Sequence, residues 1–185
     1  MKNLHILGFS GSLRRGSLNT ALLRAAQEVL PEGVTLEIFN LSAIPLYNAD
    51  VEAVGVPEPV KDFKTRIAAA DALSIATPEY NYSIPGVLKN AIDWASRPPK
   101  DSPLNGKPLA IMGASGGPSG TMRAQMHLRQ VCVFTNMLPL NKPEVYVMKA
   151  FEKFDSAGKL VDEPTRQRIH ELLEALATWT RKLIQ

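Results

Sequence analysis

The fold is decided by residues 3–29, which read NLHILGFSGSLRRGSLNTALLRAAQEV. Residues 3–9 form a short apolar run that suits a strand buried on both faces of a sheet. From Ser17 onward, apolar residues recur at helical spacing, at Leu18, Leu22, Ala25, Ala26 and Val29. A loop of small polar residues and two arginines separates the two patterns. This stretch therefore predicts one strand, one polar loop and one helix.

The same alternation continues along the chain. Further strands are predicted for residues 34–39, 71–78 and 107–115, and for a segment between 137 and 147 that contains two prolines. Helical spacing recurs from Pro57 onward and over 87–96, 122–132 and 169–184, while the Pro-, Asn- and Asp-rich segment before Pro57 is expected to form a loop. The pattern predicts an α/β three-layer sandwich over residues 1–185. We expect one domain with a five-stranded parallel sheet of order 2-1-3-4-5.

Composition excludes several classes of protein. The formal charge is +3, and the 21 basic and 18 acidic residues are spread along the chain, which argues against a nucleic-acid surface. No apolar run approaches the roughly 20 residues that a membrane span requires, and the first apolar run is too short for a signal peptide. The single cysteine, Cys132, cannot form an intramolecular disulfide. We therefore expect a cytoplasmic protein that binds neither nucleic acid nor membrane.

Three loops have unusual composition, and they follow the first, third and fourth predicted strands. These loops are residues 10–17, 77–85 and 113–120. In an open parallel sheet, ligands bind outside the carboxyl ends of the strands. Because these three strands are neighbours in the order 2-1-3-4-5, their loops are expected to converge on a single site.

The first loop is consistent with an anion site or with an ordinary turn. Ser17 stands where a helix N-cap belongs, and a helix start exposes backbone N–H groups that favour an anion. Further donors for a phosphate are available from Ser10, Ser12, Asn19 and either Arg14 or Arg15. The spacing matches neither the dinucleotide fingerprint nor the P-loop.

The other two loops favour a flat ring. Residues 77–85 combine tyrosines with an amide, and residues 113–120 offer glycines that permit close backbone approach, with Ser115 as a polar contact. Together the three loops suit a mononucleotide with a planar ring. No cluster of His, Cys and carboxylate residues has metal-ligand spacing, and His127 and His170 are given no role.

Four segments resemble the NADPH-dependent FMN reductase family, in its branch of bacterial quinone and chromate reductases. They are GSLRRGSLN at 11–19, TPEYNYSIPGVLKNAIDW at 77–94, MHLRQ at 126–130 and NKPE at 141–144. The resemblance covers nearly the whole chain. It implies a flavodoxin-like fold, bound FMN, NADPH or NADH as co-substrate, and a cytosolic homotetramer built as a dimer of dimers.

The resemblance also implies roles for individual residues. The FMN phosphate would be held by Ser12, Leu13, Arg14, Arg15, Gly16, Ser17, Leu18 and Asn19. The ribityl chain and the ring would be lined by Pro78, Glu79, Tyr80, Asn81 and Tyr82, and the pyrimidine end by Ser115 and Gly116. Contacts between subunits would involve Tyr82, Arg123 and Glu144.

The implied activity is hydride transfer from NAD(P)H through FMN to a small-molecule acceptor. NAD(P)H would reduce the ring at N5 and leave before the acceptor enters, which gives a ping-pong mechanism with no catalytic side chain. Backbone donors near the pyrimidine edge would stabilise the reduced ring. Quinones, chromate, azo dyes, ferric complexes and free flavin are all possible acceptors. Two alternatives remain open: a flavodoxin-type electron carrier without a nicotinamide site, and a mononucleotide-binding protein without redox activity.

Overall fold

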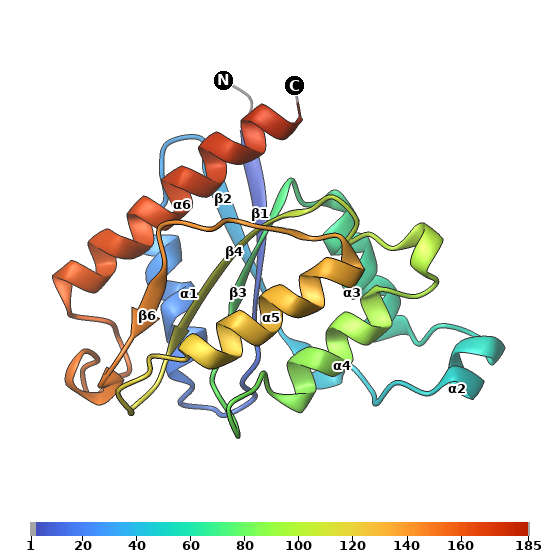
Figure 1. The fold of residues 1–185 in the computed structure, drawn as a ribbon, viewed down its shortest axis with the longest axis horizontal. Helices are drawn as coiled ribbons and strands as arrows, with labels where there is room; N and C mark the ends of the chain where they lie inside the picture. Colours follow the sequence, from blue (N-terminus) through green and yellow to red (C-terminus); the bar gives the residue numbers. More distant parts are fainter. Residues whose placement is uncertain (1–2, 185) are drawn as a thin grey trace.

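The computed structural model describes residues 3–184 and shows helices on both faces of a twisted sheet (Figure 1). The strands are β1 Leu4–Ser10, β2 Val34–Phe39, β3 Ala72–Ala76, β4 Pro108–Ala114, β5 Leu138–Pro139 and β6 Val145–Val147. The α-helices are α1 Leu18–Glu28, α2 Ala49–Val54, α3 Glu58–Ala69, α4 Gly86–Ala95, α5 Met122–Thr135 and α6 Glu163–Leu183. Three short 3-10 turns cover Leu41–Ala43, Pro99–Asp101 and Ala150–Glu152.

Within the described residues, every strand pairing is parallel and the order β2-β1-β3-β4-β5 confirms the prediction. Alternate residues of each central strand enter opposite cores, as the period of two requires. On β1, Leu7 and Phe9 pack with α3, α4 and α5, whereas Leu4 and Ile6 pack with α1 and α6. The sheet is thus buried on both faces, which explains why its central strands are continuous apolar runs.

The predicted fifth strand is instead two short strands, β5 and β6. β5 pairs with the start of β4, whereas β6 pairs with its end, at Met112, Gly113 and Ala114. Pro139 and Pro143 fall in and between the two strands, and a proline has no backbone N–H to contribute to a ladder. Two separate strands therefore lie along the same edge of β4, β5 beside its first half and β6 beside its second half.

Two further predictions need correction. The segment before Pro57 contains the helix α2, which begins after Asn48, whose side chain accepts the backbone N–H of Asp50. At the other end of the chain, the apolar spacing over 169–184 predicts a buried face up to Ile184, but Leu183 and Ile184 are both 46% exposed. Within residues 3–184, no helix is both long enough and apolar enough to cross a bilayer.

Cys132 lies on α5 and is buried against the core that α3, α4 and α5 form. Burial raises the pKa of its thiol to about 12, because the thiolate would lose its hydration. The side chain is therefore a protonated, packing thiol at neutral pH.

Asn19 joins the first helix to the fourth strand. Its side-chain amide donates to the carbonyl of Ala114 at 3.1 Å and accepts the N–H of Ala114 at 2.9 Å, and all of these groups are buried. Both backbone groups of Ala114 thus depend on one side chain. The first turn of α1 is held at the end of β4 as a result.

We expect Asn19→Ala to lower the free energy of unfolding by about 3 kcal/mol, because it leaves two buried backbone groups without partners. Urea unfolding without added nucleotide measures this value. Thr20→Ala is the matched control in the same turn, with an expected change within about 0.5 kcal/mol. Equal losses in the two variants would show that the Asn19 bonds do not matter for stability.

Candidate functional site

The loops after β1, β3 and β4 lie side by side at one edge of the sheet. The N–H of Gly11 donates to the carbonyl of Ala76 at 2.9 Å, and the N–H of Thr77 donates to the carbonyl of Met112 at 3.0 Å. These bonds continue the sheet pairing one residue beyond the strands. The three loops therefore converge, as the strand order predicts.

The first loop ends in a capped helix. The Ser17 hydroxyl accepts the backbone N–H of Thr20 at 3.1 Å, which is an N-cap bond. The next two residues, Leu18 and Asn19, have no earlier helical carbonyl to accept their N–H groups. The start of α1 therefore presents backbone donors and a positive dipole end to an anion.

A pocket of about 300 Å³ lies where the three loops meet, and we call it the cofactor pocket. It is lined by Ser12, Arg14, Ser17, Leu18, Asn19, Pro78, Glu79, Tyr80, Ala114, Ser115, Gly116 and Phe151. All but Ala114 and Phe151 belong to the predicted cofactor-binding set. Residues far apart in the sequence thus form one cavity.

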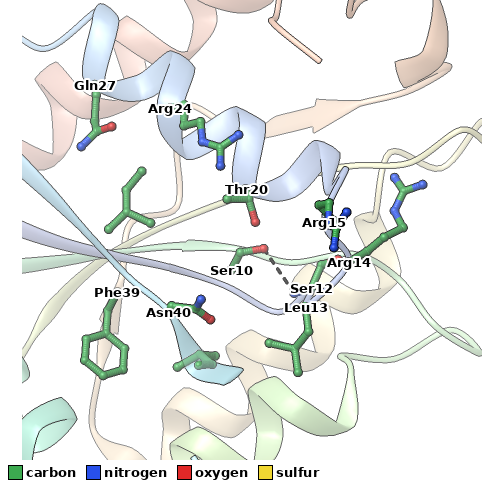
Figure 2. A pocket seen from close by; sticks show the side chains of 12 residues that line it. Ser10, Ser12, Leu13, Arg14, Arg15, Thr20, Arg24, Gln27, Phe39 and Asn40 are labelled. Carbon is green, nitrogen blue, oxygen red and sulfur yellow. Dashed lines mark hydrogen bonds between the residues drawn. The ribbon is translucent and has the colours of Figure 1, made fainter. Parts of the chain in front are cut away.

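The remaining predicted residues lie elsewhere. Leu13 and Arg15 line a second pocket on the β2 side of the loop, which Figure 2 shows. Gly16, Asn81 and Tyr82 line neither of these two pockets. The structure does not place these five residues around the cofactor pocket.

Asn81 and Tyr82 form the tip of a tight turn. Tyr80 and Ser83 exchange two backbone hydrogen bonds of 3.0 Å, and the two residues between them have positive φ, 52° for Asn81 and 63° for Tyr82. Left-handed conformation at both central positions is typical of a type I′ turn. The ring of Tyr82 is exposed, and its centre lies 4.1 Å from the Arg123 guanidinium carbon.

The carboxylate of Glu79 is directed at the N-terminus of α5. It accepts the backbone N–H groups of Arg123 at 3.0 Å and Ala124 at 3.2 Å, and it pairs with the Arg123 side chain at 3.0 Å. Thr121, at the N-cap position, makes no side-chain cap bond. Glu79 therefore caps α5 from a different loop and fixes the turn after β3 against the loop after β4.

Phe151 is a lining residue that the sequence analysis missed. Its ring lies against Gly116, where a Cβ atom would come within 2.3 Å of the ring. Gly116 therefore has to lack a side chain for Phe151 to stand beside the pocket. The sequence could have indicated Phe151 by its place after β6, because the segment after this strand lies at the same edge of the sheet as the other three loops.

The side chains present fit a flavin mononucleotide. The lining includes hydroxyls, a guanidinium and the start of α1, which suit a phosphate. It also includes the aromatic side chains of Tyr80 and Phe151, and the ring of Phe151 lies against Gly116. This donor set would hold a phosphate and a planar ring at the same time.

We expect Glu79→Ala to lower the free energy of unfolding by about 2 kcal/mol, because the start of α5 loses its cap. Glu79→Gln keeps one acceptor oxygen and should lose less. Glu58→Ala is the control, since Glu58 pairs with Lys61 but its side chain is 83% exposed, and about 0.5 kcal/mol or less is expected. Thermal and urea unfolding of the three variants test the cap, which is refuted if Glu79→Ala and Glu58→Ala behave alike.

Known proteins resemble this chain over nearly its whole length. The family model described as NADPH-dependent FMN reductase matches residues 4–152. An NAD(P)H-dependent FMN reductase of Pseudomonas aeruginosa is 55% identical over 181 residues, covering 98% of this chain and 97% of the relative. A 2-hydroxy-1,4-benzoquinone reductase of a Burkholderia species is 43% identical, covering 92% of this chain and 93% of the relative.

A solved structure agrees with these relatives. FerB, a flavoenzyme NAD(P)H:(acceptor) oxidoreductase from Paracoccus denitrificans, has a TM-score of 0.88 and 34% identity, covering 97% of this chain and 98% of FerB. The sheet order, the lining of the cofactor pocket and these similarities all indicate a flavin-dependent oxidoreductase. The chain belongs to the NADPH-dependent FMN reductase family, and it is a flavodoxin-like, FMN-dependent NAD(P)H oxidoreductase.

Proposed function

We propose that this oxidoreductase reduces quinones, with FMN held in the cofactor pocket. The observation that carries the proposal is the make-up of that pocket, which combines polar and cationic phosphate donors with two aromatic side chains. Tyr80 is 53% exposed and Phe151 is 72% exposed, so the aromatic end is accessible to a second flat molecule. Relatives named as quinone reductases support the choice of acceptor.

The phosphate end is assigned to the loop after β1 and the start of α1. Ser12, Arg14, Ser17, Leu18 and Asn19 line this end of the pocket and supply hydroxyl, guanidinium and backbone donors. Leu13, Arg15 and Gly16, which belong to the same loop, remain predicted contributors to the phosphate site. Leu13 and Arg15 line the neighbouring pocket.

The ring end is assigned to the loops after β3 and β4. Pro78, Tyr80, Ser115 and Gly116 line it directly. Glu79 acts as a positioning residue, because its carboxylate is already bonded to the start of α5. The turn tip, residues 81–82, then affects the ring through the position of Tyr80.

We propose a ping-pong mechanism without a catalytic side chain. FMN, when bound, supplies the two-electron chemistry that connects NAD(P)H to the acceptor. Among the described residues that line the pocket, Glu79 is the only carboxylic acid, and it is committed to capping α5. The protein's part is to hold the cofactor, to leave the ring face accessible, and to present the backbone N–H of Gly116, since that of Ser115 already donates to the carbonyl of Val147 at 3.0 Å.

The proposal also includes a dimer-of-dimers homotetramer in the cytoplasm, with residues 1–185 as one domain. Tyr82, Arg123 and Glu144 are exposed, which supports their predicted place between subunits. Cys132 is a buried free thiol, as suits a reducing compartment.

One sheet with a core on each face, running from Leu4 to Val147, supports the single domain. Chromate, azo dyes, ferric complexes and free flavin remain further proposed acceptors.

The direct test is the visible spectrum of the purified, FMN-saturated protein. We expect anaerobic NADPH to bleach the flavin and a benzoquinone to restore the colour, with no partner protein present. Steady-state double-reciprocal plots should give parallel lines, because the two substrates use the same ring face in turn. A flavin that NADPH fails to bleach would support the electron-carrier alternative, and converging lines would refute the ping-pong order.

Arg14→Ala should weaken FMN binding about ten- to a hundredfold, because a charge-assisted bond to the phosphate contributes roughly 1.5–3 kcal/mol. Quinone turnover per bound flavin should change much less. Flavin release during dialysis and the rate normalised to flavin content measure the two effects. Lys100→Ala is the control, since it removes one exposed positive charge on the 3-10 turn Pro99–Asp101. Unchanged FMN affinity would remove Arg14 from the cradle.

A further inference from the structure

A second pocket lies on the other side of the loop that follows β1. Its volume is about 480 Å³, and we call it the Arg24 pocket. The lining comes from β1 and its loop, from α1, and from the end of β2 (Figure 2). These residues are Ser10, Ser12, Leu13, Arg14, Arg15, Thr20, Arg24, Gln27, Ile38, Phe39, Asn40 and Leu41. The two pockets share Ser12 and Arg14 alone among the described residues.

The Arg24 pocket has a strong excess of positive charge. Three arginines, Arg14, Arg15 and Arg24, line it, and none of its described lining residues is acidic. No ion pair within residues 3–184 involves any of the three. Three cations that surround one cavity without a counter-ion repel each other, and an anion in the cavity would relieve this repulsion.

Other arginines of the chain show the contrast. Arg66 pairs with Asp62 at 2.9 Å, Arg166 with Glu28 at 2.8 Å, and Arg168 with Glu171 at 3.0 Å. Among the described residues, Arg97, Arg129 and Arg181 also lack an ion pair, but they are scattered along the chain. The Arg24 pocket differs because three arginines without a carboxylate partner line one cavity.

The FMN phosphate accounts for only one of these charges, that of Arg14, which also lines the cofactor pocket. The backbone donors at the start of α1 face the cofactor pocket, whereas Thr20, Arg24 and Gln27 line the Arg24 pocket from successive turns along the side of α1. Arg15 and Arg24 line this pocket and do not line the cofactor pocket. A phosphate cradled at the start of α1 leaves both of these side chains available.

The polar lining is suited to phosphate oxygens, which accept hydrogen bonds only. Arginine donates in a planar fork that matches phosphate, and the hydroxyl of Thr20 adds a donor. The Asn40 side-chain oxygen accepts the N–H of Ser42 at 2.9 Å, so the amide NH₂ group of Asn40 remains a donor. Apolar contacts with the organic part of a ligand are available from Leu13, Ile38 and Leu41.

We propose that the Arg24 pocket binds the phosphate group of a small ligand other than FMN. Two sources share this chemistry. The phosphate could be the 2′-phosphate of NADPH, whose adenosine end would then lie on the β2 side of the loop, or it could belong to a separate phosphorylated metabolite. The first source rests on the proposed use of NAD(P)H at the cofactor pocket, whereas the second does not.

The test is calorimetric titration of the FMN-saturated protein with inorganic pyrophosphate at low ionic strength. Saturation with FMN keeps the cofactor pocket closed to the probe. We expect saturable binding by the wild-type protein, and affinity about ten- to a hundredfold weaker in Arg24→Ala. Arg24→Lys keeps the charge and should recover part of the affinity. Arg24 is exposed on α1, and alanine favours a helix, so the variant should fold.

Lys100→Ala is the matched control, because it removes one exposed positive charge outside the Arg24 pocket. It should titrate as the wild type does. The proposal is overturned if the FMN-saturated wild type binds no pyrophosphate, or if Arg24→Ala and Lys100→Ala have equal affinity. This titration requires no turnover, so its result is independent of whether NADPH reduces the flavin.

Kinetics then distinguish the two sources. If the phosphate is that of NADPH, Arg24→Ala raises the KM for NADPH about tenfold or more and leaves the KM for NADH unchanged. If the phosphate belongs to a separate metabolite, both KM values stay at the wild-type level while the pyrophosphate affinity falls. Flavin content, measured by visible absorbance, should equal that of the wild type in every Arg24 variant.

Discussion

The pair of hydrogen bonds between the Asn19 side chain and the backbone of Ala114 is the constraint on which the site depends. These bonds hold the first turn of α1 against the end of β4. The donors for the phosphate and the backbone of residues 115–116 therefore have one fixed separation. Because both Ala114 groups are buried, losing the contact would leave them without water or protein partners. Asn19 is thus as much a structural residue as a binding one.

The loop after β3 is also held by a contact with a distant element, the start of α5. Glu79 caps this helix, because the side chain of Thr121 at the N-cap position makes no capping bond. A Cβ atom at Gly113 would lie 2.0 Å from the Thr121 hydroxyl, so Thr121 packs directly on β4. The side-chain amide of Gln125 donates to that hydroxyl and to the carbonyl of Val145. The start of α5 is therefore bonded to the loop after β3 through Glu79 and to β6 through Gln125.

The four arginines near the two pockets have different partners. Arg123 pairs with Glu79 and stacks on Tyr82, so its positive charge is neutralised by Glu79 and helps to fix the turn that carries Tyr82. Arg14, Arg15 and Arg24 have no such partner and surround one cavity. The net charge of +3 says nothing of this division, because paired and unpaired charges count equally in it. What an anion meets is the local excess around the loop after β1.

Apolar periodicity and the position of Ser17 are local signals, and they were enough to predict the layers of the fold, the strand order and the meeting of three loops. The sequence did not predict the division of the last edge strand into β5 and β6, the helix α2 or the part played by Phe151. The division into β5 and β6 depends on pairing with the free edge of β4, and the place of Phe151 depends on its packing against Gly116. Only the packing of the folded chain brings the Glu79 carboxylate to the start of α5 and Arg15 and Arg24 to the same cavity. Neighbouring residues of one motif can point to opposite sides of a loop, and only the packing of the surrounding elements selects the side.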